Sequence, residues 1–141
     1  MTMNKLLILV VLLGVTVTAV QSQGYSSISG YVWCCENCTD PAHPFANATV
    51  QVQCGTIVAM EATTDSKGFF SLVVVDGLLN FISSVLNTAV DLRTCTLNVY
   101  TPLSQCDATL TSSGFLLSNI ASTSQPRVFA PVRFIFYRYY V

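Results

Sequence analysis

The sequence predicts a mainly β protein, a single antiparallel β-sandwich or barrel-like domain with one inserted amphipathic helix. Apolar and polar residues alternate strictly from Val50 to Cys54, which is the pattern of a strand with one buried face. A second β-rich run covers residues 56–63. A third, residues 68–75, is β-branched and aromatic enough for a largely buried strand. Between them, Asp65 and Gly68 suit the first and fourth positions of a type I turn, so two consecutive hairpins are expected.

Residues 1–22 have the layout of a secretory signal peptide. Lys5 supplies a positive charge, residues 6–17 are apolar except for Gly14 and Thr16, and small residues follow. The apolar run of about 15 residues is shorter than the roughly 20 that a membrane-spanning helix needs. We therefore expect cleavage at about residues 20–24, and residues 23–141 to form a secreted β domain that is not transmembrane.

The composition and the missing motifs exclude several function classes. The chain of 141 residues is 52% hydrophobic and 9% charged, with a formal net charge of −1, whereas nucleic-acid binding needs a dense basic face. The single histidine, His43, lies in a proline-rich loop, and no nucleophile-elbow motif is present. The seven carboxylates form no pair at a spacing typical of acid–base catalysis. We therefore predict that the protein is not an enzyme.

The first strand of the domain is expected at residues 26–33, with Gly30 placed for close packing or a bulge. The loop that follows holds a glycosylation sequon at Asn37, and a second sequon, at Asn47, lies at the start of the next strand. Asn47 is the stronger acceptor candidate, because Cys38 beside Asn37 is expected to be in a disulfide.

Six cysteines, all beyond the leader, predict three disulfides formed in an oxidising compartment. Strand phase places Cys54 and Cys95 on inward faces of the same core, where a bridge between them would tie two strands together. Cys34 also faces inward, and Cys106 follows the strand that contains Cys95. The two cysteines that remain form a local pair, Cys35 and Cys38.

Cys35, Cys38 and His43 also match half of a zinc site, and a Cys-x-x-Cys pair can be a redox centre. No fourth zinc ligand is evident, and no thioredoxin-like βαβ pattern surrounds the pair. Thiols also oxidise outside the cell. The sequence therefore predicts structural disulfides, with no metal and no cofactor.

One helix interrupts the β pattern, at about residues 77–91, and Asp76 is placed to cap its start. Its apolar face includes the candidates for surface binding, which are Leu79, Ile82, Val85 and Leu86. Two interpretations stay open. The helix is a lid packed over the open face or end of the β domain, or it presents a partly exposed apolar surface to a lipid, wax or membrane.

Three further β segments are expected after the helix. Residues 94–101 form a strand, and residues 114–117 form a short one. The last run, residues 127–140, is strongly aromatic, and Pro126 and Pro131 favour an edge position for its first part. We expect its rings to lie mainly in the core, with the final tyrosines exposed.

Several motifs resemble the olive-pollen major allergen/extensin-like family. They are Ile28-x-Gly30-x-Val32-x-Cys34, Pro44-x-Ala46-Asn47-Ala48-x-Val50-x-Val52-x-Cys54-Gly55 and Thr64-Asp65-x-x-Gly68-x-Phe70-Ser71-Leu72. Two later motifs are more similar to the phylloplanins, glycoproteins that plants secrete onto leaf surfaces. These are Cys95-x-Leu97-x-Val99 and Thr101-Pro102-Leu103-Ser104-x-Cys106-x-Ala108-Thr109-Leu110.

The resemblance implies a secreted β-sandwich or barrel-like domain in which Cys34 pairs with Cys106 and Cys54 with Cys95. It also implies a non-catalytic antimicrobial protein that acts on leaf-infecting fungi and oomycetes. The extra pair Cys35 and Cys38, the inserted helix and the lack of a C-terminal cysteine all depart from the pollen-allergen pattern.

Two main functions follow as hypotheses. The first is a secreted, glycosylated defence protein of the plant surface, whose partner is a microbial surface, a lipid or a wax. The alternative is an extensin-like cell-wall module that binds polysaccharide or wall protein, for which exposed tyrosines near the C-terminus are suited. A lipid carrier is a third hypothesis, and it would require an internal cavity.

Overall fold

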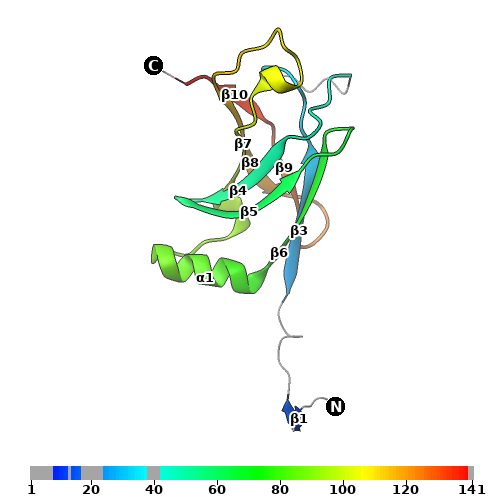
Figure 1. The fold of residues 1–141 in the computed structure, drawn as a ribbon. Helices are drawn as coiled ribbons and strands as arrows, with labels where there is room; N and C mark the ends of the chain where they lie inside the picture. The colour runs from blue at the N-terminus through cyan, green and yellow to red at the C-terminus, as the bar shows by residue number, and fades with distance from the viewer. Residues whose placement is uncertain (1–7, 13, 17–23, 38–41, 140–141) are drawn as a thin grey trace.

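The computed structural model describes residues 8–12, 14–16, 24–37 and 42–139 (Figure 1). Within the predicted leader it contains a separate antiparallel pair, β1 (Ile8–Leu12) and β2 (Gly14–Thr16). Most of the predicted cleavage region falls outside the described residues, so the signal peptide stays a prediction.

The remaining strands form one sheet that curves until it nearly closes into a barrel (Figure 1). Its strand order is β5-β4-β7-β8-β9-β3-β6, and β10 pairs with β8 beside that path. The mainly β, barrel-like prediction with one inserted helix is therefore confirmed. The strands are β3 (Tyr25–Tyr31), β4 (Thr49–Cys54), β5 (Ile57–Thr63), β6 (Phe69–Val75), β7 (Thr96–Val99), β8 (Phe115–Ser122), β9 (Val128–Pro131) and β10 (Ile135–Tyr137).

The turn between β5 and β6 joins the two ends of the strand order. The Gly68 N–H donates to the Asp65 carbonyl oxygen at 3.0 Å, as the predicted turn requires. The Asp65 carboxylate accepts from the backbone N–H groups of Lys67 at 2.8 Å and Phe69 at 3.0 Å. Gly68 has φ of +77°, a left-handed conformation that favours glycine. Asp and Gly at these two positions thus fix the turn that brings β5 and β6 together.

The predicted edge position of the last β run is wrong. β9 lies between β8, with which it is antiparallel, and β3, with which it is parallel. Proline is tolerated inside the sheet because only Val128 and Phe129 pair with β3, whereas Pro131 lies beyond that pairing at the end of the strand. The run also divides into β9 and β10, and the short strand expected at residues 114–117 continues to Ser122 as β8.

The core lies inside the curved sheet and is closed at one end by α1 (Asp76–Leu86). The helix is shorter than predicted because Asn87 adopts a left-handed conformation, with φ of 56°, and ends it. The capping prediction is wrong as well, since Asp76 is the first helical residue and the N-cap, Val75, has no side-chain hydrogen bond. Two short 3₁₀ helices flank β7: η2 (Leu92–Thr94) precedes it, and η3 (Leu103–Gln105) lies between it and β8.

Two disulfides join distant parts of the chain. Cys54 is bonded to Cys95 with their Cα atoms 4.4 Å apart, and this bridge links the neighbouring strands β4 and β7. Cys34 is bonded to Cys106, with a Cα separation of 6.2 Å. Cys35 is also disulfide-bonded. Its predicted partner, Cys38, lies outside the described residues.

Candidate binding surfaces

The inner side of α1 belongs to the core. Ile82 is 1% exposed, and Leu78, Leu79 and Leu86 are half-buried against the core residues. Among the predicted surface-binding residues, Ile82 is therefore misassigned, because its side chain is enclosed by the barrel. This side of the helix acts as the lid that one interpretation of the sequence describes.

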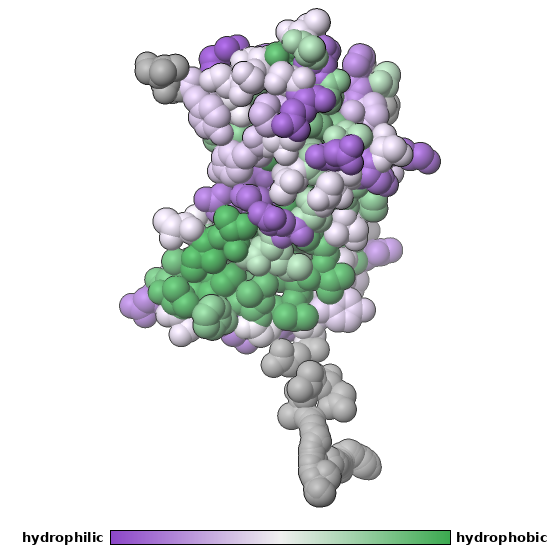
Figure 2. All heavy atoms as spheres, viewed as in Figure 1, coloured by the Kyte–Doolittle hydropathy of each residue, from purple (hydrophilic) through white to green (hydrophobic). Residues whose placement is uncertain are grey.

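The outer side of α1 exposes large apolar side chains. Phe81 is 65% exposed and Val85 is 56% exposed. Their spacing of four residues puts them next to each other on the helix. Val58 on the adjacent strand β5 is exposed too. Figure 2 shows apolar residues gathered over α1 and the neighbouring part of the sheet. α1 is thus both a lid and an apolar surface.

Phe81 was not among the predicted binding residues. The sequence pattern centres the apolar face on Ile82, and Phe81 lies on its flank beside Asn80, so it did not fit the inward stripe. The sequence could still have indicated it, because a large aromatic residue outside the buried stripe of a helix is expected to be exposed to solvent.

Contacts at its C-terminal end fix the position of α1. The Ser83 hydroxyl donates to the Leu79 carbonyl oxygen at 2.9 Å and accepts from the Val90 N–H at 3.0 Å, which fixes the return of the chain after the helix. At its C-terminal end, Leu86 packs against the β4–β5 turn at Gly55. Phe81 and Val85 are therefore presented by a fixed scaffold.

α1 carries almost no charge. Asp76 is its only charged residue, and the helix contains no cation. The Asp76 carboxylate accepts from Arg127 Nη2, and Arg127 Nε donates to the Tyr25 carbonyl oxygen at 2.6 Å. Through these two contacts, Arg127 links the start of α1 to the start of β3. Phe81 and Val85 are left without neighbouring charge on their own helix.

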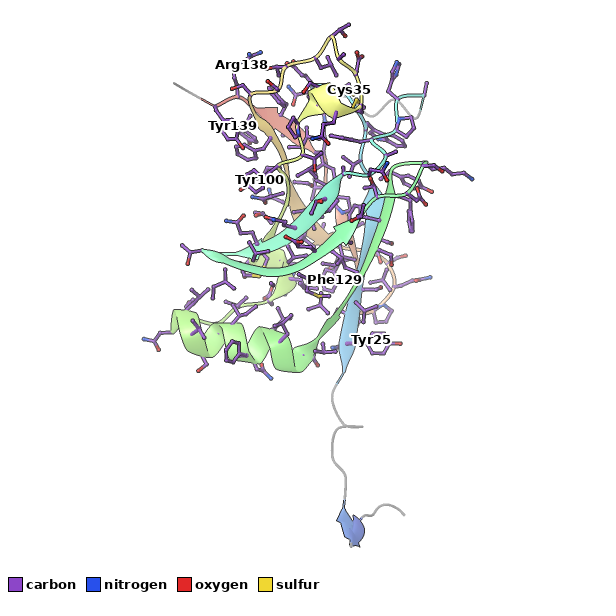
Figure 3. The ribbon with its side chains drawn as sticks, in the orientation of Figure 1. Tyr25, Cys35, Tyr100, Phe129, Arg138 and Tyr139 are labelled. Atoms are coloured by element: carbon purple, nitrogen blue, oxygen red, sulfur yellow. A yellow bond between two sulfur atoms is a disulfide. The ribbon has the colours of Figure 1, made fainter. Side chains whose placement is uncertain are left out.

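A second surface consists of exposed tyrosines around Phe115. The ring centroids of Tyr100, Tyr137 and Tyr139 lie 5.1, 5.7 and 5.6 Å from that of Phe115. Figure 3 shows Tyr100 and Tyr139 on the same side of the molecule. Tyr139 is exposed, as expected for the final tyrosines, whereas Tyr137, which was expected in the core with the rest of this run, is exposed as well. The phenylalanines of the run, Phe129, Phe134 and Phe136, pack partly buried against the core.

Amide side chains hold one ring of the tyrosine cluster in place. Asn98 Nδ2 donates to the Tyr100 hydroxyl oxygen at 2.8 Å and to Gln53 Oε1 at 3.0 Å. The Tyr100 hydroxyl in turn donates to Gln53 Oε1 at 3.2 Å. These bonds join β4, β7 and the residue after β7.

Both predicted glycan acceptors are exposed and have left-handed backbones, with φ of 59°. The Asn37 side-chain oxygen accepts from the Phe136 N–H, so its amide group is engaged with β10. No side-chain hydrogen bond from Asn47 is seen among the described residues. Occupancy of either site stays a prediction.

The pKa of one carboxylate is shifted by its hydrogen bonds. Hydrogen bonds from the Thr109 hydroxyl, at 2.7 Å, and from its N–H, at 3.0 Å, lower the pKa of Asp107, which stabilises a local turn. Within the described ranges, no three His, Cys, Asp or Glu side chains are grouped to hold a metal ion. No helix there is long and apolar enough to cross a membrane.

Comparison with known proteins supplies a family context. Residues 20–130 match the family described as phylloplanin antifungal protein. Phylloplanin of Nicotiana tabacum is 39% identical over 100 residues, a match that covers 66% of this chain and 58% of the relative. The matched region thus spans little more than half of that relative. No solved structure matches this chain.

Proposed function

The chain belongs to the phylloplanin family, and we propose that it is a secreted plant-surface protein that inhibits fungi and oomycetes without catalysis. It acts by adsorbing through the outer side of α1 to an uncharged lipid or wax surface. The observation that carries this proposal is the exposure of Phe81 and Val85 on a helix whose opposite side is anchored in the core.

The exposed apolar area supports weak adsorption. Full burial of a large apolar side chain contributes about 1.5–3 kcal/mol, and since Phe81 and Val85 are 65% and 56% exposed, burying the exposed parts contributes roughly 2–4 kcal/mol in total. This corresponds to reversible attachment that is weaker than that of a single acyl chain. Many copies at a surface can therefore form a coating without any one of them inserting deeply.

The absence of cations from α1 indicates which type of lipid surface it would bind. Helices that bind anionic membranes carry Lys or Arg on their polar face, and each such residue contributes about 1 kcal/mol near the surface. α1 contains none. Attachment should therefore be insensitive to salt and to anionic lipid. A leaf wax or an uncharged lipid layer of a spore fits this chemistry better than an acidic bilayer.

Spore germination with purified protein tests the proposal. The double variant Phe81→Ser/Val85→Ser should lose both adsorption to neutral phospholipid vesicles and inhibition of germination. Asn80→Ala, an exposed polar change on the same helix, is the matched control and should retain both. Full inhibition by the folded double variant would refute the role of α1.

The tyrosine cluster favours a second candidate function, retention on the plant cell wall. Exposed Tyr100, Tyr137 and Tyr139 offer rings and hydroxyl groups to a sugar chain. In this case Tyr137→Ala should reduce retention on isolated wall material, whereas Phe81→Ser should not. Equal retention of both variants would exclude a role for the cluster.

A further inference from the structure

A stacked pair of aromatic rings lies at the end of β3, away from α1 and the tyrosine cluster. The rings of Tyr31 and Trp33 are nearly parallel, at 5°, with their centroids 5.4 Å apart. Phe69, which pairs with Tyr31 across β3 and β6, supports the stack at 5.2 Å. Trp33 also forms a β-bridge with Pro44. The backbone that carries both rings is thus fixed by neighbours on either side.

This pair borders two hollows. The first, of about 270 Å³, is lined by Gly30, by the pair and by residues 130–134. The second, of about 440 Å³, is lined by the pair with Pro44, Ser66 and Lys67. These volumes are comparable to the lower part of the range of about 300–1,000 Å³ for ligand pockets. The two rings therefore form a wall shared by two small pockets.

Each hollow carries one cation. Arg133 lines the first and Lys67 the second. The ion pairs found between described residues are Arg93 with Asp91 and Arg127 with Asp76, and neither pair includes Arg133 or Lys67. Arg133 Nη2 donates to the Asn37 carbonyl oxygen at 3.2 Å, which orients its guanidinium, a group with five N–H donors in all.

The carboxylate nearest to Lys67 in sequence, that of Asp65, already accepts backbone hydrogen bonds. Asp65 Oδ1 accepts from the N–H groups of Lys67 and Phe69, so it serves the β5–β6 turn. The protein as a whole has a formal charge of −1. Any attraction of an anion to this site is therefore local, and comes from Arg133 and Lys67 and not from the net charge.

We propose that the Tyr31–Trp33 pair and its two hollows bind an acidic polysaccharide, a chain of uronic-acid sugars. Aromatic faces are electron-rich and pack against the C–H face of a sugar ring. Guanidinium and ammonium groups pair with carboxylates, the guanidinium through two hydrogen bonds. One chain passing the aromatic wall places carboxylates on both sides of it. This site is separate from α1 and does not depend on the antifungal proposal.

Calorimetric titration of the purified protein with polygalacturonate oligomers tests the site. Trp33→Ala and the double variant Lys67→Gln/Arg133→Gln should each weaken binding about tenfold, the effect expected from losing one stacked ring or charge-assisted bonds. Arg93→Gln, which also removes a surface cation, is the charge control. Tyr25→Ala, which removes an exposed ring at the opposite end of β3, is the aromatic control. Both controls should bind within about twofold of the unmodified protein.

Two further readouts separate the ligand classes. Binding should weaken as salt is raised, because surface ion pairs are screened, and laminarin, a neutral glucan, should bind at least about tenfold more weakly. Equal affinity for laminarin would overturn the proposal, as would unchanged binding by Lys67→Gln/Arg133→Gln, in which both changed side chains are exposed. A loss caused by Tyr137→Ala but not by Trp33→Ala would assign binding to the tyrosine cluster and would also overturn it.

Discussion

Gly30 in β3 packs closely against Pro131 in the neighbouring strand β9, because a Cβ atom added to Gly30 would lie 2.6 Å from Pro131 Cδ. The predicted close-packing role of Gly30 is thereby explained. We expect Gly30→Ala to destabilise the protein by about 1–3 kcal/mol, because the rigid proline ring cannot move aside without separating the strands. Urea denaturation followed by circular dichroism measures this loss.

A double-mutant cycle provides the control. In the Pro131→Ala background, Gly30→Ala should cost markedly less, because the ring that it strikes is gone. Strictly additive effects of the two substitutions would show that the cost has another origin.

The two sides of α1 should respond differently to substitution. Ile82→Ala should lower the free energy of unfolding by about 2–5 kcal/mol, since it leaves a cavity in the core. Phe81→Ser should change it by no more than about 0.5 kcal/mol, because Phe81 is exposed. Thermal denaturation of both variants checks the contrast, and similar losses would mean that Phe81 is part of the core.

Buried Thr64 joins two segments of the chain through its hydroxyl group. It donates to the Phe45 carbonyl oxygen and accepts from the Ala48 N–H at 2.9 Å. Thr64→Val keeps the shape but leaves both backbone groups unsatisfied, at a cost of about 1–3 kcal/mol each. Thr64→Ser, which keeps the hydroxyl, should lose less in the same urea titration. The opposite order would show that packing of the methyl group matters more than these bonds.

Removing the bridge between β4 and β7 should destabilise the protein strongly. The Cys54 and Cys95 positions are 41 residues apart in sequence. Closing a loop of that size contributes about 4 kcal/mol in the chain-entropy model. Cys54→Ala/Cys95→Ala should therefore unfold at lower urea concentration. Because β4 and β7 are also paired by hydrogen bonds, the folded variant should still show the circular dichroism spectrum of a β protein. A loss of under about 1 kcal/mol in the free energy of unfolding would contradict the chain-entropy account.

The local part of the fold could be predicted from the sequence, and the long-range part could not. Alternation from Val50 to Cys54 and the Asp65–Gly68 turn depend on neighbouring residues, so β4, β5 and β6 were predictable. The position of β9 depends on its pairing with β3, about a hundred residues earlier, and no local pattern encodes that. Proline at Pro131 favoured an edge, whereas the short pairing with β3 makes it acceptable inside the sheet.

The surfaces were predictable only in outline for a similar reason. The helical period correctly indicated an amphipathic helix, but it could not tell which members of the stripe would be enclosed. Ile82 is buried, whereas its immediate neighbour in sequence, Phe81, is exposed. The Tyr31–Trp33 pair follows from strand alternation, yet the first of its hollows depends on residues 130–134, which reach it only through the barrel's closure.

The insertion of β9 between β8 and β3 has a consequence for how the protein is made. β9 follows β3 by about a hundred residues in the chain, so β3 stays unpaired along one side until β9 has been synthesised. A product truncated before Val128 would present two bare strand edges, on β3 and on β8, and such edges template aggregation. Stop codons placed before Val128 should therefore give aggregated chains and not shortened, working ones.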